Sequence, residues 1–165
     1  MSMFAPEKQV DNNINFDNIL ALIKDGRISS ALCVLQNSEN TTETAKLFAL
    51  GICFLKAEEY SSASEYFEKA LIALKQSQLS GNQYPKTDIY RKLRKRELSD
   101  RTYLTPFDNS FIALGGEQVK ENIILALAES CFLAGNTDKA KTLINSLIGE
   151  EFDEIKINFF EKEQS

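Results

Sequence analysis

Apolar residues recur at every third or fourth position over most of the chain, a spacing that places them along one face of an α-helix. Two such stripes follow one another in the middle of the chain: Leu47, Leu50, Gly51 and Phe54, and then Ala63, Phe67, Ala70 and Leu74. The polar residues Glu58 and Glu59 between them predict a short turn. Two antiparallel helices would bury these stripes against each other, and the small residues Gly51 and Ala63 would let the backbones approach closely. The pattern predicts a helical hairpin.

Weaker copies of this hairpin flank it on both sides. Upstream, the segment 26–31 repeats the turn and the start of the second helix, with Ala31 standing 32 residues before Ala63. Downstream, the segment 135–140 begins a third copy. Helix pairs are therefore predicted at about 14–38, 44–75 and 119–148. The composition, with seven glycines and three prolines, also favours an all-α fold, and 165 residues suit a single domain, 1–165.

The second and third copies are out of phase. Ala63 and Ala140 lie 77 residues apart, whereas one intervening repeat would leave about 34. An insertion at 76–117 explains the difference. It contains several residues that break helices, which predict a partly ordered loop: Ser80, Gly81, Asn82, Pro85, Pro106, Gly115 and Gly116.

Two further helices are predicted outside the three pairs. Within the insertion, the segment from Asp88 to Ser99 predicts a short helix with Ile89, Leu93 and Tyr90 on its apolar side and its charges turned outward. The last helix, at about 150–162, has spaced apolar residues that are typical of a capping or partner-binding helix.

The central hairpin, from Thr44 to Leu74, resembles the tetratricopeptide repeat (TPR). The matching positions are the large apolar Leu47, the Leu50-Gly51 pair, the aromatic Phe54, and then Tyr60, Ala63, Phe67 and Ala70 of the second helix. The customary closing proline is replaced by Lys75. The resemblance, which with its weaker copies covers most of 14–148, implies antiparallel helix pairs stacked as a short right-handed superhelix with a long insertion.

The order of the elements is similar to the amino-terminal region of the TPR subunits of the anaphase-promoting complex, most of all to subunit seven. Those subunits are scaffolds whose amino-terminal repeats form homodimers. The similarity implies a protein–protein interaction scaffold that self-associates, as a subunit of a ubiquitin-ligase assembly that controls the cell cycle. The order of elements carries this resemblance, and other TPR proteins share that order.

In a TPR array the first helices of the repeats line a groove, and here the residues expected to face it are apolar. They are Phe16, Leu20 and Ile23 in the first pair, Phe48, Ile52 and Leu55 in the second, and Leu125 and Phe132 in the third. Because the helix from Thr44 to Lys56 is apolar nearly all round, something must cover it. Two alternatives stay open: the chain's own insertion or last helix fills the groove, or a second copy or partner helix does.

Charge is unevenly distributed along the chain. The formal net charge is −5, which argues against nucleic-acid binding, because phosphate contacts require a positive surface. Between Lys86 and Arg101, however, seven basic residues face three acidic ones, a net +4 that leaves −9 for the rest of the chain. Arg91, Arg94, Lys95 and Arg96 in this run are candidate contacts for an acidic partner, although a charge run is more often a solvated helix face.

Membrane spans, secretion and common catalytic chemistry find no support in the sequence. The longest apolar run, Leu47 to Leu55, is far shorter than the roughly 20 residues of a membrane span. The first residues do not have the layout of a secretory signal. We therefore expect an intracellular protein, cytoplasmic or nuclear. With no histidine, Ser–His, Cys–His and histidine–metal sites are excluded. Three distant cysteines, Cys33, Cys53 and Cys131, are expected to be core thiols. We therefore expect no enzyme, cofactor or metal.

Two functional hypotheses follow. The first is a scaffold that self-associates, as a homodimer, through the apolar groove. The second is a monomeric adaptor that binds a peptide or a phosphate group through the basic insertion. They differ in the residues that carry the binding, which are apolar in the first hypothesis and basic in the second.

Overall fold

The structure, a computed structural model, describes residues 16–38, 43–77, 85–162 and 164. Within these ranges it contains helices and turns and no strand, which confirms the all-α prediction. The elements are α1 (Phe16–Lys24), α2 (Ile28–Gln36), α3 (Glu43–Lys56), α4 (Tyr60–Gln76), α5 (Asp88–Ser99), η1 (Thr102–Leu104), α6 (Asn109–Leu114), α7 (Gly116–Leu133), α8 (Thr137–Asn145), η2 (Glu150–Phe152) and α9 (Asp153–Glu161). The predicted start of the first pair at residue 14 lies outside the described residues, as do Ser80, Gly81 and Asn82 of the insertion.

Three hairpins, α1–α2, α3–α4 and α7–α8, share one turn geometry. In each, the residue that ends the turn donates a backbone hydrogen bond to a carbonyl five residues earlier, at 2.8, 2.9 and 2.8 Å. The residue before that donor has a left-handed backbone: Gly26 (φ +74°), Glu58 (φ +62°) and Gly135 (φ +87°). This is the arrangement in which a left-handed residue closes a helix and frees the chain to reverse. Two of the three turns use glycine, which adopts this conformation without strain.

Small residues let α3 and α4 pack closely. A Cβ atom added to Gly51 would lie 2.5 Å from the Phe67 ring, so only glycine fits at this point of α3. On α4, Ala63 is fully buried, as are the corresponding Ala31 of α2 and Ala140 of α8. The close approach that the sequence indicated for this hairpin is therefore present.

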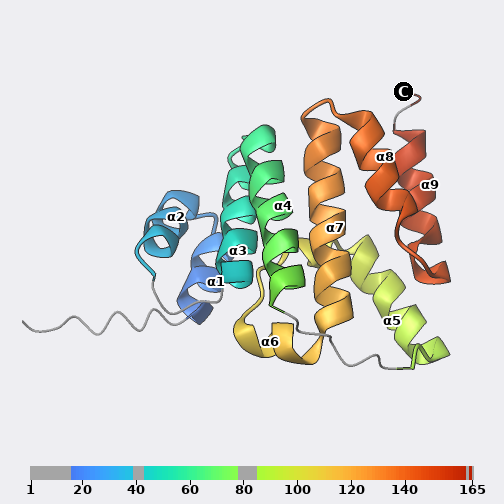
Figure 1. Ribbon diagram of the computed structural model, residues 1–165, viewed down its shortest axis with the longest axis horizontal. Coiled ribbons are helices and arrows are strands. Elements are labelled where there is room, and N and C mark those ends of the chain that lie inside the picture. Colours follow the sequence, from blue (N-terminus) through green and yellow to red (C-terminus); the bar gives the residue numbers. More distant parts are fainter. Residues whose placement is uncertain (1–15, 39–42, 78–84, 163, 165) are drawn as a thin grey trace, which may run out of the picture.

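The hairpins lie side by side in the order α1–α2, α3–α4, α7–α8 (Figure 1). Helix α4 packs directly against α7, although the two are separated by the whole segment 77–115. Residues 85–115 of that segment form α5, η1 and α6 along the lower side of the row of helices and lead to the start of α7 (Figure 1). A continuous hydrophobic core runs from Phe16 of α1 to Ala140 of α8, and a second cluster joins α7 and α8 to Leu98 and Phe152.

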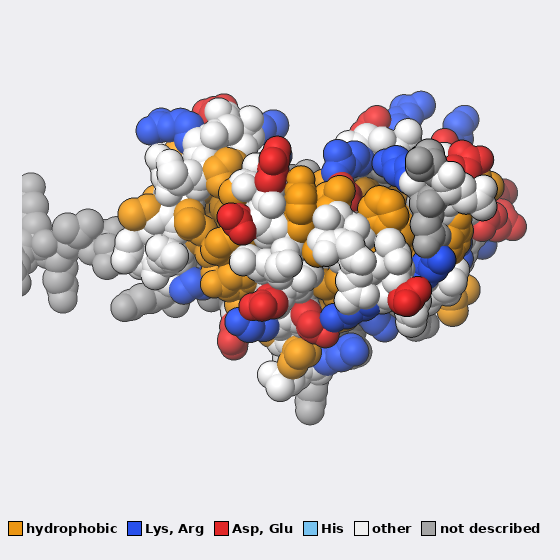
Figure 2. All heavy atoms as spheres, turned by 90° about the horizontal axis from the view of Figure 1, so that it is seen from above, with side chains coloured by type: hydrophobic (Ala, Val, Ile, Leu, Met, Phe, Trp, Pro, Cys, Tyr) orange, Lys and Arg blue, Asp and Glu red, His pale blue; other side chains and the backbone are white. Residues whose placement is uncertain are grey.

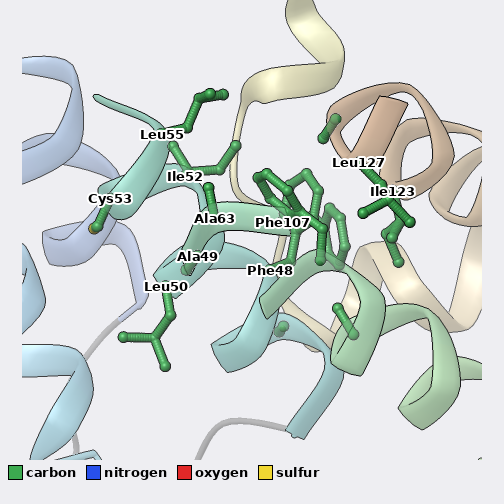
Figure 3. Close-up of a cluster of buried hydrophobic side chains, with 14 of the residues drawn as sticks. Phe48, Ala49, Leu50, Ile52, Cys53, Leu55, Ala63, Phe107, Ile123 and Leu127 are labelled. Carbon is green, nitrogen blue, oxygen red and sulfur yellow. The ribbon is translucent and has the colours of Figure 1, made fainter. Parts of the chain in front are cut away.

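The insertion covers the helix that is apolar all round. Phe107, which follows η1, stacks on Phe48 of α3 with ring centroids 4.5 Å apart, and Phe48 in turn contacts Phe67 of α4 at 5.3 Å. Figure 3 shows Phe107 beside Phe48, with Ile123 and Leu127 of α7 pointing toward the same cluster. Of the two alternatives left open by the sequence, the structure contains the first: the chain's own insertion covers this face of α3.

The helix at Asp88–Ser99 is confirmed, but the prediction of which face it buries is wrong. Ile89 and Leu93, expected to pack inward, are 73% and 54% exposed, whereas Arg94 is 1% exposed and Leu98 is buried. The reason is that Glu121 and Asn122 of α7, which are distant in sequence, meet Arg94 in the folded chain, so that an ion pair and a hydrogen bond compensate burial of the guanidinium.

The last helix is present as α9, preceded by the short η2. None of its side chains is fully buried, and it is held by Phe159, whose ring lies edge-on to Phe132 of α7 at 5.0 Å. Among the described residues, no helix is long and apolar enough to cross a bilayer.

Candidate protein-interaction surface

A cluster of buried charges fixes α5 to the rest of the fold. Lys86, just before α5, donates to Glu151 of η2 at 2.9 Å and to Glu121 of α7 at 3.3 Å. Arg94 donates to Asn122 of α7 at 2.6 Å and lies 3.4 Å from Glu121. The side chains of Arg94 and Glu151 are almost completely buried. These charge-assisted hydrogen bonds hold the start and the middle of α5 against α7 and η2.

The electrostatics of this cluster differ between its two carboxyl groups. Burial disfavours ionisation of Glu151, but the hydrogen bonds from Lys86 and from the backbone N–H of Glu151, together with the charges of Lys86 and Arg91, outweigh it and lower the pKa of Glu151 below its ordinary value. For Glu121 burial dominates and raises the pKa, although Lys86 and Arg94 act against it. The Lys86 ammonium also loses hydration, yet its hydrogen bond to Glu151 and the nearby carboxylates raise its pKa. The cluster is therefore a compensated structural unit.

A second anchor follows α5. The hydroxyl of Tyr103 in η1 donates to Glu129 of α7 at 2.8 Å, and Arg101 also pairs with Glu129. Burial and the Glu129 carboxylate raise the pKa of the Tyr103 hydroxyl well above its ordinary value. Together with the charge cluster, these contacts hold both ends of α5 against α7.

The outward face of α5 combines apolar and basic side chains. Ile89 and Leu93 are one turn apart, so their side chains are neighbours on the helix surface. Lys92 and Arg96, also one turn apart, are exposed on the adjoining part of the same face. Neither of these two basic residues takes part in the ion pairs found within the described ranges. We call Ile89, Lys92, Leu93 and Arg96 the outer α5 face.

A hollow of about 300 Å³ lies beside this face, between the start of α5 and the junction of α6 and α7. Tyr90 lines it from α5, and Phe111 and Leu114 line it from α6. Leu114 is 63% exposed. Because Tyr90 is three residues before Leu93, the hollow continues the apolar part of the outer α5 face.

A separate cleft of about 290 Å³ lies among α5, η1, α7, α8 and α9. Its apolar wall includes Leu125 and Phe132 of α7 and Phe159 of α9, and Lys95 and Arg101 stand on its polar side. The cleft contains acidic and basic side chains in mixed order, so it has no charge of one sign that would select a partner.

Most of the eight apolar residues expected to face a binding groove lie in the core. Six of them are buried within the protomer: Phe16, Ile23, Phe48, Ile52, Leu55 and Leu125. Leu20 and Phe132 are partly buried and pack against the same core. Within the protomer these side chains are therefore covered by the insertion and neighbouring helices, which is the first of the two alternatives left open by the sequence.

The four basic residues proposed for an acidic partner separate into two groups. Lys95 and Arg96 are exposed, whereas Arg94 is buried among its carboxylate partners and Arg91 is partly buried and lies 3.5 Å from Asp88. Arg94 is thus a structural residue and cannot be a surface contact. Lys92, which the sequence reading left out, joins Arg96 on the exposed face.

Acidic and basic side chains are interspersed on the face that carries the α3–α4 and α7–α8 turns. Figure 2, which looks down on these turns, shows red and blue side chains scattered among apolar and neutral ones. On the outer α5 face both charged residues, Lys92 and Arg96, are basic, and the exposed Asp88 one turn before Lys92 lies 3.5 Å from Arg91.

The described part of the chain contains acidic side chains and thiols, which are potential metal ligands. It contains no group of three acidic or cysteine side chains placed to hold a metal ion. Cys53 and Cys131 are buried, as expected of core thiols, but Cys33 is exposed, because it lies on the side of α2 that faces away from α3. Burial raises the pKa of the Cys53 thiol to about 11, which keeps it protonated and unreactive at neutral pH.

No protein-family model, curated protein or solved structure matches the chain.

Proposed function

We propose that the chain is a protein–protein interaction scaffold whose helix pairs stack as a short right-handed superhelix of the TPR type. The observation that carries the proposal is the turn shared by α1–α2, α3–α4 and α7–α8, with its left-handed residue and its hydrogen bond across five residues. Repetition of one turn, together with direct packing of α4 on α7, supports a stack of repeats. Such stacks serve to present surfaces to other proteins.

The partner binds on the outer surface of the insertion, not in the inner groove. Phe48 and Ile52, which would have carried the energy of self-association, are fully buried in the protomer. The outer α5 face, in contrast, exposes Ile89 and Leu93 on a helix that buried charges hold in place. The scaffold therefore acts as a monomeric unit that binds through the insertion, as in the second of the two hypotheses drawn from the sequence, and not as the homodimer of the first. Membership of a ubiquitin-ligase assembly is a prediction that rests on the resemblance alone.

Site-specific photo-cross-linking tests this proposal. A benzophenone amino acid replaces Leu93 on α5 or, as a control, Ile72 on α4, which is exposed to a similar degree, 54% against 50%. The variants are irradiated in an extract of the cells that make the protein, and adducts are identified by mass spectrometry. We expect protein adducts at position 93 and not at position 72. Equal adducts at both positions, or none at position 93, would refute the proposal.

A further inference from the structure

We propose that the outer α5 face binds an acidic amphipathic helix of another protein, an inference that rests on the proposed function and names its partner class. The partner helix would place leucine-like side chains on Ile89 and Leu93 and acidic side chains against Lys92 and Arg96. Three features of the surface lead to this conclusion: the shape of its apolar part, the sign of its charge and the rigidity of α5.

The apolar part of the surface fits a helix. Ile89 and Leu93 form a ridge along α5, and a helix packs by placing its own side chains in the grooves beside such a ridge. The hollow lined by Tyr90, Phe111 and Leu114 lies next to the ridge and offers space for one large apolar side chain of the partner. With 12 residues, α5 is about 18 Å long, enough to support three turns of a partner helix.

The charge of the surface selects an acidic partner. Helix α5 holds five basic and two acidic residues, a net +3, in a chain whose net charge is −5. Arg94 uses its charge internally and Arg91 pairs with the exposed Asp88, which leaves Lys92, Lys95 and Arg96 exposed on α5, with Lys92 and Arg96 on the outer face. A short acidic helix can reach these two charges without approaching the acidic remainder of the protein. An anionic membrane or a nucleic acid is more extended and would also meet that remainder, which repels it.

The rigidity of α5 favours tight binding. Because Arg94 and Tyr103 tie α5 to α7, the exposed side chains are held on a fixed helix before the partner arrives. A surface that is already ordered loses less conformational entropy on binding than a flexible segment would. The buried cluster thus positions the outer face without contacting the partner.

A designed peptide provides the test. The probe is a fluorescein-labelled peptide of roughly 18 residues, long enough to lie along all of α5, with leucines at helical spacing on one face and glutamates beside them. In one control peptide lysines replace the glutamates, and in another glutamines replace the leucines. Binding to the full chain is measured by fluorescence anisotropy at low and at high salt. Phosphatidylserine-containing vesicles and a uridine-rich single-stranded RNA are tested in parallel.

Two double variants separate the apolar from the charged contribution. Ile89→Ser with Leu93→Ser removes the ridge, and Lys92→Glu with Arg96→Glu reverses the charge. We expect each to weaken binding of the acidic peptide by at least about 10-fold, and high salt to weaken the wild-type complex. The charge-reversed variant should bind the lysine peptide more tightly than the wild type does, a gain that loss of folding cannot produce.

Matched substitutions elsewhere serve as controls. Ile72→Ser removes an equally exposed apolar side chain from α4, and Lys56→Glu with Lys75→Glu reverses two exposed charges away from α5. Both should leave the affinity within about twofold of the wild type, because neither changes a residue of the outer α5 face. Circular dichroism confirms that each variant keeps its helices.

Three results would overturn the inference: unchanged binding of the acidic peptide by the charge-reversed variant, equal binding of both charged peptides by the wild type, or binding of vesicles or RNA in place of the acidic peptide. The proposed scaffold function and the proposed partner class are refuted by different results. If the acidic peptide does not bind but cross-linking at Leu93 still yields protein adducts, the partner class is wrong and the scaffold function stands. If neither is observed, both are wrong.

Discussion

Removal of the Phe107 ring should destabilise the whole fold, although this residue lies in the insertion and outside any helix. The side chain is only 6% exposed and belongs to the same core as α3, α4 and α7. Its ring stacks on Phe48 at 4.5 Å and contacts Phe111 at 5.9 Å. In the variant Phe107→Ala, these contacts are replaced by a cavity or by collapse of the surrounding chain.

The expected loss is large compared with the stability of a small domain. Truncation of a buried phenylalanine to alanine usually costs about 3–5 kcal/mol, which already includes the cavity. Because the segment around residue 107 can partly collapse into the space, we expect about 3 kcal/mol. Domains of this size are stable by roughly 5–15 kcal/mol, so the variant should fold but unfold at clearly lower denaturant concentration.

Urea unfolding followed by circular dichroism measures this loss. Leu114→Ala in α6 is the control, because Leu114 belongs to the same insertion but is largely exposed and should change the free energy of unfolding by no more than about 0.5 kcal/mol. A loss below about 1 kcal/mol for Phe107→Ala would refute the reasoning. It would show that the insertion does not cover α3 and that Phe48 is free for another contact.

Four further predictions concern other parts of the fold. Glu58→Gly should stabilise the protein by about 0.5–1 kcal/mol in urea unfolding, because glycine adopts the left-handed backbone of this turn without strain. Gly51→Ala should destabilise it by about 1–3 kcal/mol in the same assay, since the new methyl group would overlap the Phe67 ring. Arg94→Met should cost about 3–5 kcal/mol, because it removes one of the two cations that pair with the buried Glu121 carboxylate. Burial raises the pKa of Cys53 from 9.0 to about 11, so the thiol ionises at lower pH in the unfolded chain than in the folded protein. Its contribution to stability is therefore present below pH 9.0 and is lost as the pH rises toward about 11, by about 2–3 kcal/mol in all. The free energies of unfolding of wild type and Cys53→Ala, measured across this range, should converge by that amount.

Each of these predictions has a result that contradicts it. A destabilised Glu58→Gly variant would mean that the glutamate side chain contributes more than its backbone strain removes. An unchanged Gly51→Ala variant would mean that α3 and α4 are not in close contact. If Arg94→Met and the exposed Arg96→Met lose equal stability, Arg94 is not buried. If the two pH curves stay parallel, the Cys53 thiol is accessible to water in the folded protein.

The helix pairs could be predicted because their signals are local. The spacing of apolar residues sets the buried face of each helix, and Gly26 and Gly135 mark two of the three turns. The helix at Asp88–Ser99 was also predicted within its observed bounds, because its apolar and charged residues repeat at helical spacing. In each of these elements, residues close together in the sequence determine the local structure.

The buried face of α5 could not be predicted from local pattern. The sequence reading placed Arg94 outside because an isolated charge is rarely buried. Its burial depends on Glu121 and Asn122, which lie 27 and 28 residues away. Only the tertiary fold brings these groups to the same place. Consequently Ile89 and Leu93 were recognised as the apolar side of the helix but assigned to the core instead of to the surface.

That α3 is covered could be predicted from the sequence, but which side chain covers it could not. The all-round apolar pattern of this helix required that something cover it, and the insertion was one of two alternatives. Phe107 follows Pro106 in a segment without helical periodicity, so no local signal indicated where its ring would lie. The stacking of Phe107 on Phe48 is a long-range contact, and the structure was needed to find it.

The central claim is that the chain covers its own apolar inner face and therefore binds other proteins from outside as a monomeric unit. Light scattering of the wild type over a wide concentration range tests this claim most directly. Charged substitutions of Phe48 or Ile52 are unsuitable, because both side chains are buried and the variants would unfold instead of reporting on association. The account predicts a mass of 18.6 kDa at every concentration. A mass of twice this value that persists on dilution would contradict it, because a stable dimer must bury roughly 800 Å² on each partner, and the apolar groove expected to supply that area is already filled.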